Sequence, residues 1–126
     1  MPWLVQLNEQ GGSVKSWPLD DHPTTFGRGD DANACIDDQL MSRHHFVVSH
    51  DKGRYLIADQ KSTNGTWVNG RRTDTATLHE NDQVRAGNTR FLYHVGTATM
   101  LGQVEEKAGQ KFHDVLQDIY RKADKP

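Results

Sequence analysis

The feature that most constrains the fold of this chain is the rhythm of its apolar residues. They occur in short runs that Gly, Asn, Asp or Pro interrupts at intervals of about eight to twelve residues. Runs of this length are typical of β-strands, and regularly spaced turn residues are typical of a sandwich or barrel. The sequence therefore predicts an all-β domain.

Strands are predicted where apolar or β-branched residues alternate with polar ones. The predicted strands cover residues 3–7, 14–19, 24–28, 34–36, 45–49, 55–59, 66–68, 84–86 and 90–95. We expect residues 45–49 and 55–59 at the centre of a sheet, joined by a turn over residues 50–53. Pro18 and Pro23 lack a backbone N–H group, so the second strand should end at a sheet edge.

Residues 103–126 follow a helical period instead. Apolar side chains recur there at spacings of three and four, as on one face of an amphipathic helix: Ala108, Phe112, Val115, Leu116, Ile119 and Tyr120. A lone helix of this length is marginally stable, so this face should pack on the sandwich, on a partner or on a second copy. We expect a β-domain over residues 1–97 and a helical extension over residues 98–126.

Composition and charge limit the partners. Leu, Ile, Val and Phe make up 25 of 126 residues, but the net charge is only −2, so a folded domain with a small core is expected. Binding to nucleic acid through general attraction to phosphates needs a basic excess, which is absent.

No apolar stretch of the sequence is long enough to span a bilayer, and residues 1–7 do not resemble a signal peptide. The single Cys35 suits a reducing compartment, so we expect a cytoplasmic protein without nucleic-acid or membrane partners.

Three polar segments between predicted strands carry residue types that bind anions. They cover residues 26–29, 41–46 and 61–66. Loops at one end of a sandwich converge in space, and here they would bring together Arg28, Ser42, Arg43, Thr63 and Asn64. Guanidinium groups match the geometry of phosphate, and hydroxyl and backbone N–H groups complete the shell around its oxygens. Since the three segments contain no carboxylate, the cluster is predicted to hold an anion.

The order of these motifs resembles that of the forkhead-associated (FHA) family. Gly27-Arg28 resembles the Gly-Arg motif of that family, residues 42–45 its Ser-x-x-His motif, and Asn64-Gly65 its Asn-Gly motif. Each motif alone is an ordinary turn or an exposed charge, but their joint occurrence in this order is specific. The resemblance covers residues 3–95 and implies a β-sandwich of about eleven strands whose loops bind phosphothreonine in a partner protein.

The resemblance also implies a role for each matched binding residue. Arg28 and Ser42 would bind the phosphate group directly. Arg43 and Thr63 would assist them, and Asn64 would form a hydrogen bond with the backbone of the bound peptide.

Further residues would support the site or tune its specificity. By the resemblance, Gly27, His45 and Gly65 are structural: His45 would tie the loops together from beneath, and Gly65 would permit the turn. Leu40 stands where the family often recognises the third residue after the phosphothreonine, which suggests an apolar or undemanding preference. The tryptophans are expected in the core or at its edges, with the alternative that Trp67 borders the peptide groove.

A metal site and an enzyme are the alternatives from other classes. His44 and His45 are neighbours on a predicted strand and so point to opposite faces, and HExxH and paired-Cys motifs are absent. Ser42, His45 and Asp59 could form a nucleophilic triad, but no Gly-x-Ser-x-Gly turn surrounds Ser42. Cys35 is interpreted as a small core residue. We therefore predict no enzymatic activity, no metal and no cofactor.

The predicted function is that of a phosphothreonine-dependent adaptor or scaffold in Ser/Thr kinase signalling. A phosphate group carries about −1.5 to −2 charges at neutral pH, and each charge-assisted hydrogen bond contributes about 1.5 to 3 kcal/mol. An upstream Ser/Thr kinase would therefore switch binding on. The alternative is a phosphate-independent structural scaffold or oligomerisation module that self-associates through residues 103–126.

Overall fold

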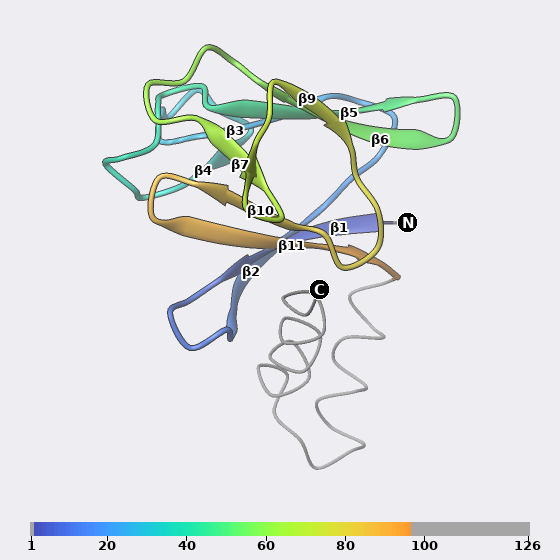
Figure 1. Cartoon of the computed structure of the whole chain (residues 1–126), viewed down its shortest axis with the longest axis horizontal. Coiled ribbons are helices and arrows are strands. Elements are labelled where there is room, and N and C mark those ends of the chain that lie inside the picture. Colours follow the sequence, from blue (N-terminus) through green and yellow to red (C-terminus); the bar gives the residue numbers. More distant parts are fainter. Residues whose placement is uncertain (1, 97–126) are drawn as a thin grey trace.

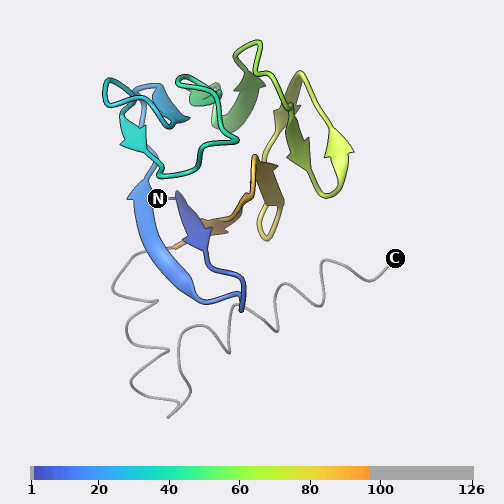
Figure 2. The same cartoon turned by 90° about the vertical axis from the view of Figure 1, so that its left-hand side faces the viewer.

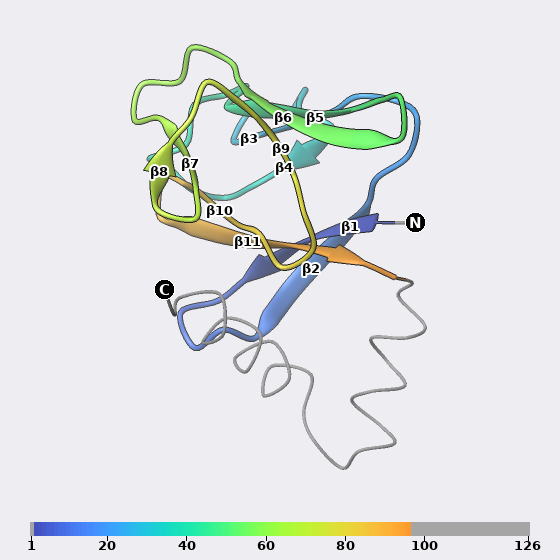
Figure 3. The same cartoon turned by 45° about the vertical axis from the view of Figure 1, so that its right-hand side comes forward.

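The computed structural model describes residues 2–96, and these form eleven β-strands in two sheets packed face to face. The strand order is β2-β1-β11-β10-β7-β8 in the six-stranded sheet and β4-β3-β5-β6-β9 in the five-stranded sheet (Figure 1). Figure 3 shows the two sheets as separate layers. The predicted all-β sandwich of eleven strands is confirmed, and the predicted helix over residues 103–126 lies outside the described residues.

The strand bounds are β1 Pro2–Leu7, β2 Ser13–Pro18, β3 Thr24–Gly27, β4 Ala34–Cys35, β5 Phe46–Asp51, β6 Arg54–Asp59, β7 Thr66–Val68, β8 Arg71–Arg72, β9 Thr75–Thr77, β10 Gln83–Ala86 and β11 Thr89–Val95. All nine predicted strands occur within two residues of their expected bounds. As expected, β2 lies at an edge, and β5 and β6 lie inside the five-stranded sheet. The short polar strands β8 and β9 were not predicted.

The core between the sheets is built around three aromatic rings. Phe26 and Phe46 stack with 4.9 Å between their ring centroids, and Phe91 contacts both edge-on at 5.7 and 5.5 Å. Trp17 adds an edge contact with Phe26 at 5.4 Å, as expected for core or edge packing. The prediction that Cys35 is a core residue is wrong: Ala34 fills the inward position of β4, so the next side chain points outward and is exposed.

Strand pairing brings three loops to one end of the sandwich. Phe46, the first residue of β5, pairs with Phe26 near the end of β3 and with Asp59 at the end of β6. The segments that follow β3, precede β5 and follow β6 therefore leave the five-stranded sheet together. They lie at the end opposite the β5–β6 turn in Figure 1, and Figure 2 views the sandwich from this end.

In this part of the chain, no helix is long and apolar enough to cross a membrane.

Candidate functional site

The Gly27-Arg28 motif lies against the segment that contains Ser42 and Arg43. The backbone N–H of Arg28 donates to the carbonyl of Ser42 at 3.0 Å, and that of Gly29 donates to the carbonyl of Arg43 at 3.1 Å. A Cβ atom at Gly27 would lie only 2.0 Å from the carbonyl oxygen of Arg43, so this close approach requires glycine. The glycine thus sets the distance between the two segments.

The side chain of Arg28 is exposed but held at one atom. Its Nε–H group donates to the carbonyl of Met41 at 2.8 Å, which fixes the direction of the guanidinium plane. Among residues 2–96, its two Nη groups have no protein partner. A fixed guanidinium with free donors is suited to bind an anion with little loss of side-chain entropy.

Hydrogen bonds join the segment before β5 to the loop between β6 and β7. The Oγ of Ser42 accepts from the backbone N–H of Thr63 at 3.1 Å, and the Nδ2 of Asn64 donates to the carbonyl of Leu40 at 2.9 Å. Ser42 is half-buried, whereas Thr63 and Asn64 are exposed. The structure thus brings together the three segments that were expected to converge, with all three side chains accessible to a ligand.

His45 lies beneath these loops and is completely buried. Its Nδ1 accepts from the backbone N–H of Ser42 at 3.0 Å, and its Nε2 lies 2.8 Å from the carbonyl oxygen of Gly65. A carbonyl can only accept, so Nε2 carries the proton. Gly65 has a φ of 89°, in the left-handed region that favours glycine. His45 and Gly65 together fix the distance between the two loops.

These contacts disfavour the serine triad. Both ring nitrogens of His45 are occupied by backbone groups, so neither is available to take a proton from the Oγ of Ser42. Asp59 accepts instead from the backbone N–H and Oγ of Ser62 and, at 2.7 Å, from the Oγ1 of Thr66. Partial burial raises the pKa of Asp59, but these hydrogen bonds outweigh it, and the pKa is lowered from 3.8. Asp59 therefore organises the β6–β7 loop.

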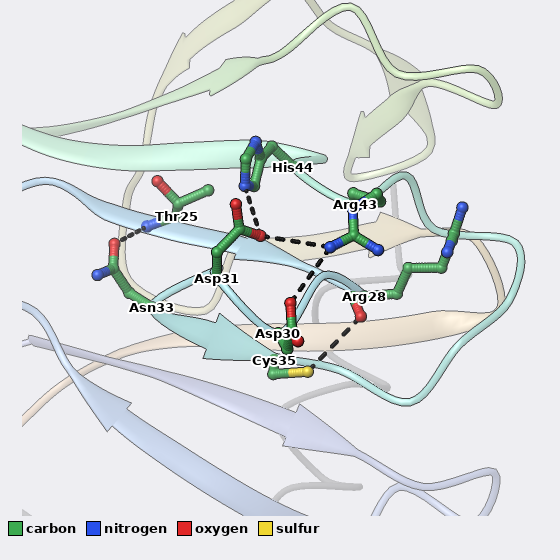
Figure 4. A network of polar contacts seen from close by, with 8 residues as sticks. All are labelled: Thr25, Arg28, Asp30, Asp31, Asn33, Cys35, Arg43 and His44. Atoms are coloured by element: carbon green, nitrogen blue, oxygen red, sulfur yellow. Dashed lines mark hydrogen bonds and ion pairs between the residues drawn. The ribbon is translucent and has the colours of Figure 1, made fainter.

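Arg43, in the segment before β5, belongs to an exposed network of charges that includes two carboxylates of the loop between β3 and β4 (Figure 4). Its Nη2 lies 3.2 Å from the Oδ1 of Asp30 and 3.8 Å from the Oδ1 of Asp31. The Nε2 of His44 lies 3.0 Å from the same Asp31 oxygen, and this hydrogen bond is the main reason that the pKa of Asp31 is lowered. The three predicted segments contain no carboxylate, but the adjacent loop supplies two. Arg43 is thus partly neutralised, while Arg28 is not.

Sequence reasoning also missed Asp38, which anchors the segment before Ser42. This residue is buried, and its carboxylate accepts from the backbone N–H groups of Leu40 and Asn88 at 2.9 and 2.8 Å. It also accepts from the Oγ1 of Thr89 at 2.7 Å. No local pattern indicates this role, because two of the three donors come from the distant β10–β11 turn. Leu40, the predicted specificity residue, is 49% exposed beside the site.

A pocket opens next to the predicted phosphate site. It is lined by Arg28, Cys35, Ile36, Asp37, Asp38 and Gln39. Arg28 therefore borders a concave surface that a peptide side chain could occupy.

Among the described residues, no group of three or more His, Cys, Asp or Glu side chains is arranged to hold a metal ion. His44 and His45 point apart, as expected: one contacts Asp31 on the surface, and the other is buried.

The chain matches known proteins both in sequence and in fold. The glycogen accumulation regulator GarA of Mycolicibacterium smegmatis is 35% identical over 89 residues, which are 70% of this chain and 56% of GarA. The FHA domain of FhaA, solved with the intracellular domain of Rv3910, superposes with a TM-score of 0.68 at 29% identity, covering 75% of this chain and all of that one. Mycobacterium tuberculosis EmbR, solved with a low-affinity phosphopeptide, gives a TM-score of 0.68 at 28% identity, covering 76% of this chain and 25% of EmbR.

The chain spans about half the length of GarA, 8% of the ABC transporter ATP-binding/permease protein Rv1747 and 17% of FhaA, the last two from Mycobacterium tuberculosis. The family model for the FHA domain matches residues 24–87, which is half of the chain and includes all three motifs. Together with the eleven-stranded sandwich and the convergence of the three loops, this match shows that the chain belongs to the FHA domain family.

Proposed function

We propose that this chain binds threonine-phosphorylated proteins and acts as an adaptor or scaffold in Ser/Thr kinase signalling, without enzymatic activity, in the cytoplasm. The observation that carries the proposal is the state of Arg28. Its guanidinium is fixed through Nε, its Nη groups are free of protein partners within residues 2–96, and it is linked through the backbone to Ser42. The EmbR structure, a complex with a phosphopeptide, supports the same ligand class for this chain.

In this proposal each predicted residue acts at a defined place. Arg28 and the Oγ of Ser42 bind the phosphate oxygens, and Arg43 and Thr63 add donors at the sides of the phosphate. Asn64 holds the peptide backbone, for which its amide would exchange its present contact with the carbonyl of Leu40. Residues 1–97 form the recognition domain, and residues 98–126 are an extension to it.

The proposal predicts a requirement for phosphate. Several charge-assisted hydrogen bonds of about 1.5 to 3 kcal/mol each would make a phosphothreonine peptide bind at least a hundredfold more tightly than its unphosphorylated form. An oriented phosphothreonine peptide library, screened with the full chain, tests this and reports the flanking preference. Matched libraries with threonine and phosphoserine are the controls. Equal retention of the threonine and phosphothreonine libraries would reject the proposal and favour a phosphate-independent scaffold.

A further inference from the structure

Three side chains form a row on the outer face of the six-stranded sheet. Arg72 on β8 pairs with Trp67 on β7, and Trp67 pairs with Arg85 on β10. Residues directly opposite each other on neighbouring strands share one face of a sheet. The residues on either side of Trp67 and of Arg85 are buried toward the core, so this row points outward: Thr66, Val68, Val84 and Ala86. Figure 3 shows β8, β7 and β10 next to one another, and we call the row the Arg72–Trp67–Arg85 strip.

The strip begins at the loop that carries Asn64. The Nε1 of Trp67 donates to the carbonyl of Asn64 at 3.4 Å. The guanidinium of Arg72 lies over the next residue, because a Cβ atom at Gly65 would be 2.7 Å from its Nε and 3.0 Å from its Cζ. The Cζ of Arg85 lies 5.0 Å from the centre of the Trp67 ring, within the range of a cation–π contact. The strip is therefore continuous with the proposed peptide site.

The strip carries two uncompensated cations. Arg72 and Arg85 are both exposed, and neither forms an ion pair with a carboxylate of residues 2–96. In the same part of the chain, Arg43 does form such pairs. The two arginines therefore place two positive charges on either side of one aromatic ring. Their planar donor groups match carboxylates and phosphates.

We propose that the Arg72–Trp67–Arg85 strip binds anionic side chains of the same phosphopeptide, either Asp and Glu or a second phosphorylated residue. This inference rests on the proposed function, in which the phosphothreonine anchors the peptide and Asn64, which contacts Trp67, holds its backbone. The strip then selects among phosphothreonine peptides by their acidic flank. Exposed ion pairs are worth about 0.2 to 1 kcal/mol, so each arginine should contribute up to about fivefold in affinity.

The test uses a series of phosphothreonine peptides in which each flanking position in turn carries a single aspartate. Peptides with alanine at the same position are the reference, and a parallel series carries phosphoserine instead of aspartate. Affinities for the full chain are compared with those of Arg72→Gln, Arg85→Gln and Arg71→Gln. Arg71 is the matched control: it is the adjacent exposed arginine on β8, and it pairs with buried Val68, so it points to the other face. Arg85→Lys keeps the charge at that position, and thermal melting verifies the fold of every variant.

We expect aspartate at one or two positions to increase affinity about two- to fivefold. This gain should disappear in Arg72→Gln or Arg85→Gln, persist in Arg71→Gln and Arg85→Lys, and shrink at high salt because exposed ion pairs are screened. A gain with phosphoserine alone assigns the strip to a second phosphate group, and a gain with both assigns it to acidic side chains in general. No gain at any position, or a gain that survives in Arg72→Gln and Arg85→Gln, would overturn the inference. Failure of every phosphothreonine peptide to bind would instead overturn the proposed function.

Discussion

His45 links the site to the core through every polar group it has. Its backbone N–H donates to the carbonyl of Phe26 at 2.8 Å, and its carbonyl accepts from the backbone N–H of Gln60 at 2.8 Å. Its two ring nitrogens contact Ser42 and Gly65. One fully buried residue thus links β3, through its backbone, to the segment before β5 and the β6–β7 loop, through its side chain.

Replacing His45 with Ala should lower the free energy of unfolding by about 2 to 4 kcal/mol, since it leaves a cavity and two unpaired backbone groups. Urea denaturation measures this loss. His44→Ala is the matched control. The side chain of His44 is exposed, so we expect the free energy of unfolding to change by no more than about 0.5 kcal/mol. Equal stability losses in the two variants would contradict the structural role of His45.

Asp59 should make stability depend on pH. Its pKa in the folded chain lies below the ordinary value of 3.8, so it stabilises the fold above that pH, and the contribution is lost as the pH falls through the folded pKa. Between about pH 5 and about pH 3, the free energy of unfolding of the wild type should therefore fall more steeply than that of Asp59→Asn. Identical slopes in the two proteins, measured by urea denaturation, would show that Asp59 does not hold the β6–β7 loop as described.

At the scale of elements, the β3–β4 loop controls the charge around the phosphate site. Asp30 and Asp31 lie beside Arg43 and oppose its attraction for an anion. Arg28, the first residue of the same loop, has no such carboxylate partner within the described residues. We therefore assign most of the attraction for phosphate to Arg28.

Asp30→Asn should increase affinity for a phosphothreonine peptide by up to about fivefold, because one exposed negative charge near the bound phosphate is removed. Isothermal titration calorimetry at low salt measures the change. Asp51→Asn, at the end of β5 that is distant from the site, should leave affinity unchanged. Weaker binding by Asp30→Asn would instead mean that the ion pair positions Arg43 for the ligand.

The strands could be predicted because alternation and turn residues are local properties of the sequence. The turn at Asn69-Gly70 is an example: both residues have left-handed φ values, 50° and 82°, as expected for a tight hairpin turn. Strands β8 and β9 are as short as the predicted strands β4 and β7, but they consist of Arg, Thr and Ala and so contain no large apolar residue that would mark a strand. The placement of Asp38 against Thr89 could not be predicted, because the two residues are distant in the sequence. The placement of Arg72 over Gly65 depends on the pairing of β7 with β8, a strand that was not predicted.

At the scale of the whole molecule, recognition is concentrated at one end of a nearly neutral domain. All residues of the proposed site, and the groups that position them, lie within residues 2–96. The domain therefore needs no broad basic surface to bind an anionic partner, consistent with its net charge of −2.

A chain shortened to residues 1–97 should bind a phosphothreonine peptide with the affinity of the full chain. Fluorescence anisotropy with a labelled peptide measures this, and size-exclusion chromatography of both proteins reports their association states. A full chain that elutes as a dimer or larger assembly, beside a shortened chain that elutes as a monomer with unchanged affinity, would assign self-association to residues 98–126. A large loss of affinity would contradict a recognition domain confined to residues 1–97.

The proposed function depends above all on the binding of the phosphate group by Arg28. The most direct measurement is the affinity of Arg28→Ala for a phosphothreonine peptide, beside Arg54→Ala, an exposed arginine at the opposite end of the sheet. We predict that Arg28→Ala loses at least about tenfold in affinity, from a loss of about 1.5 to 3 kcal/mol per charge-assisted hydrogen bond, with little change in melting temperature. Arg54→Ala should bind like the wild type. Equal affinity of both variants for the phosphorylated peptide would contradict the account.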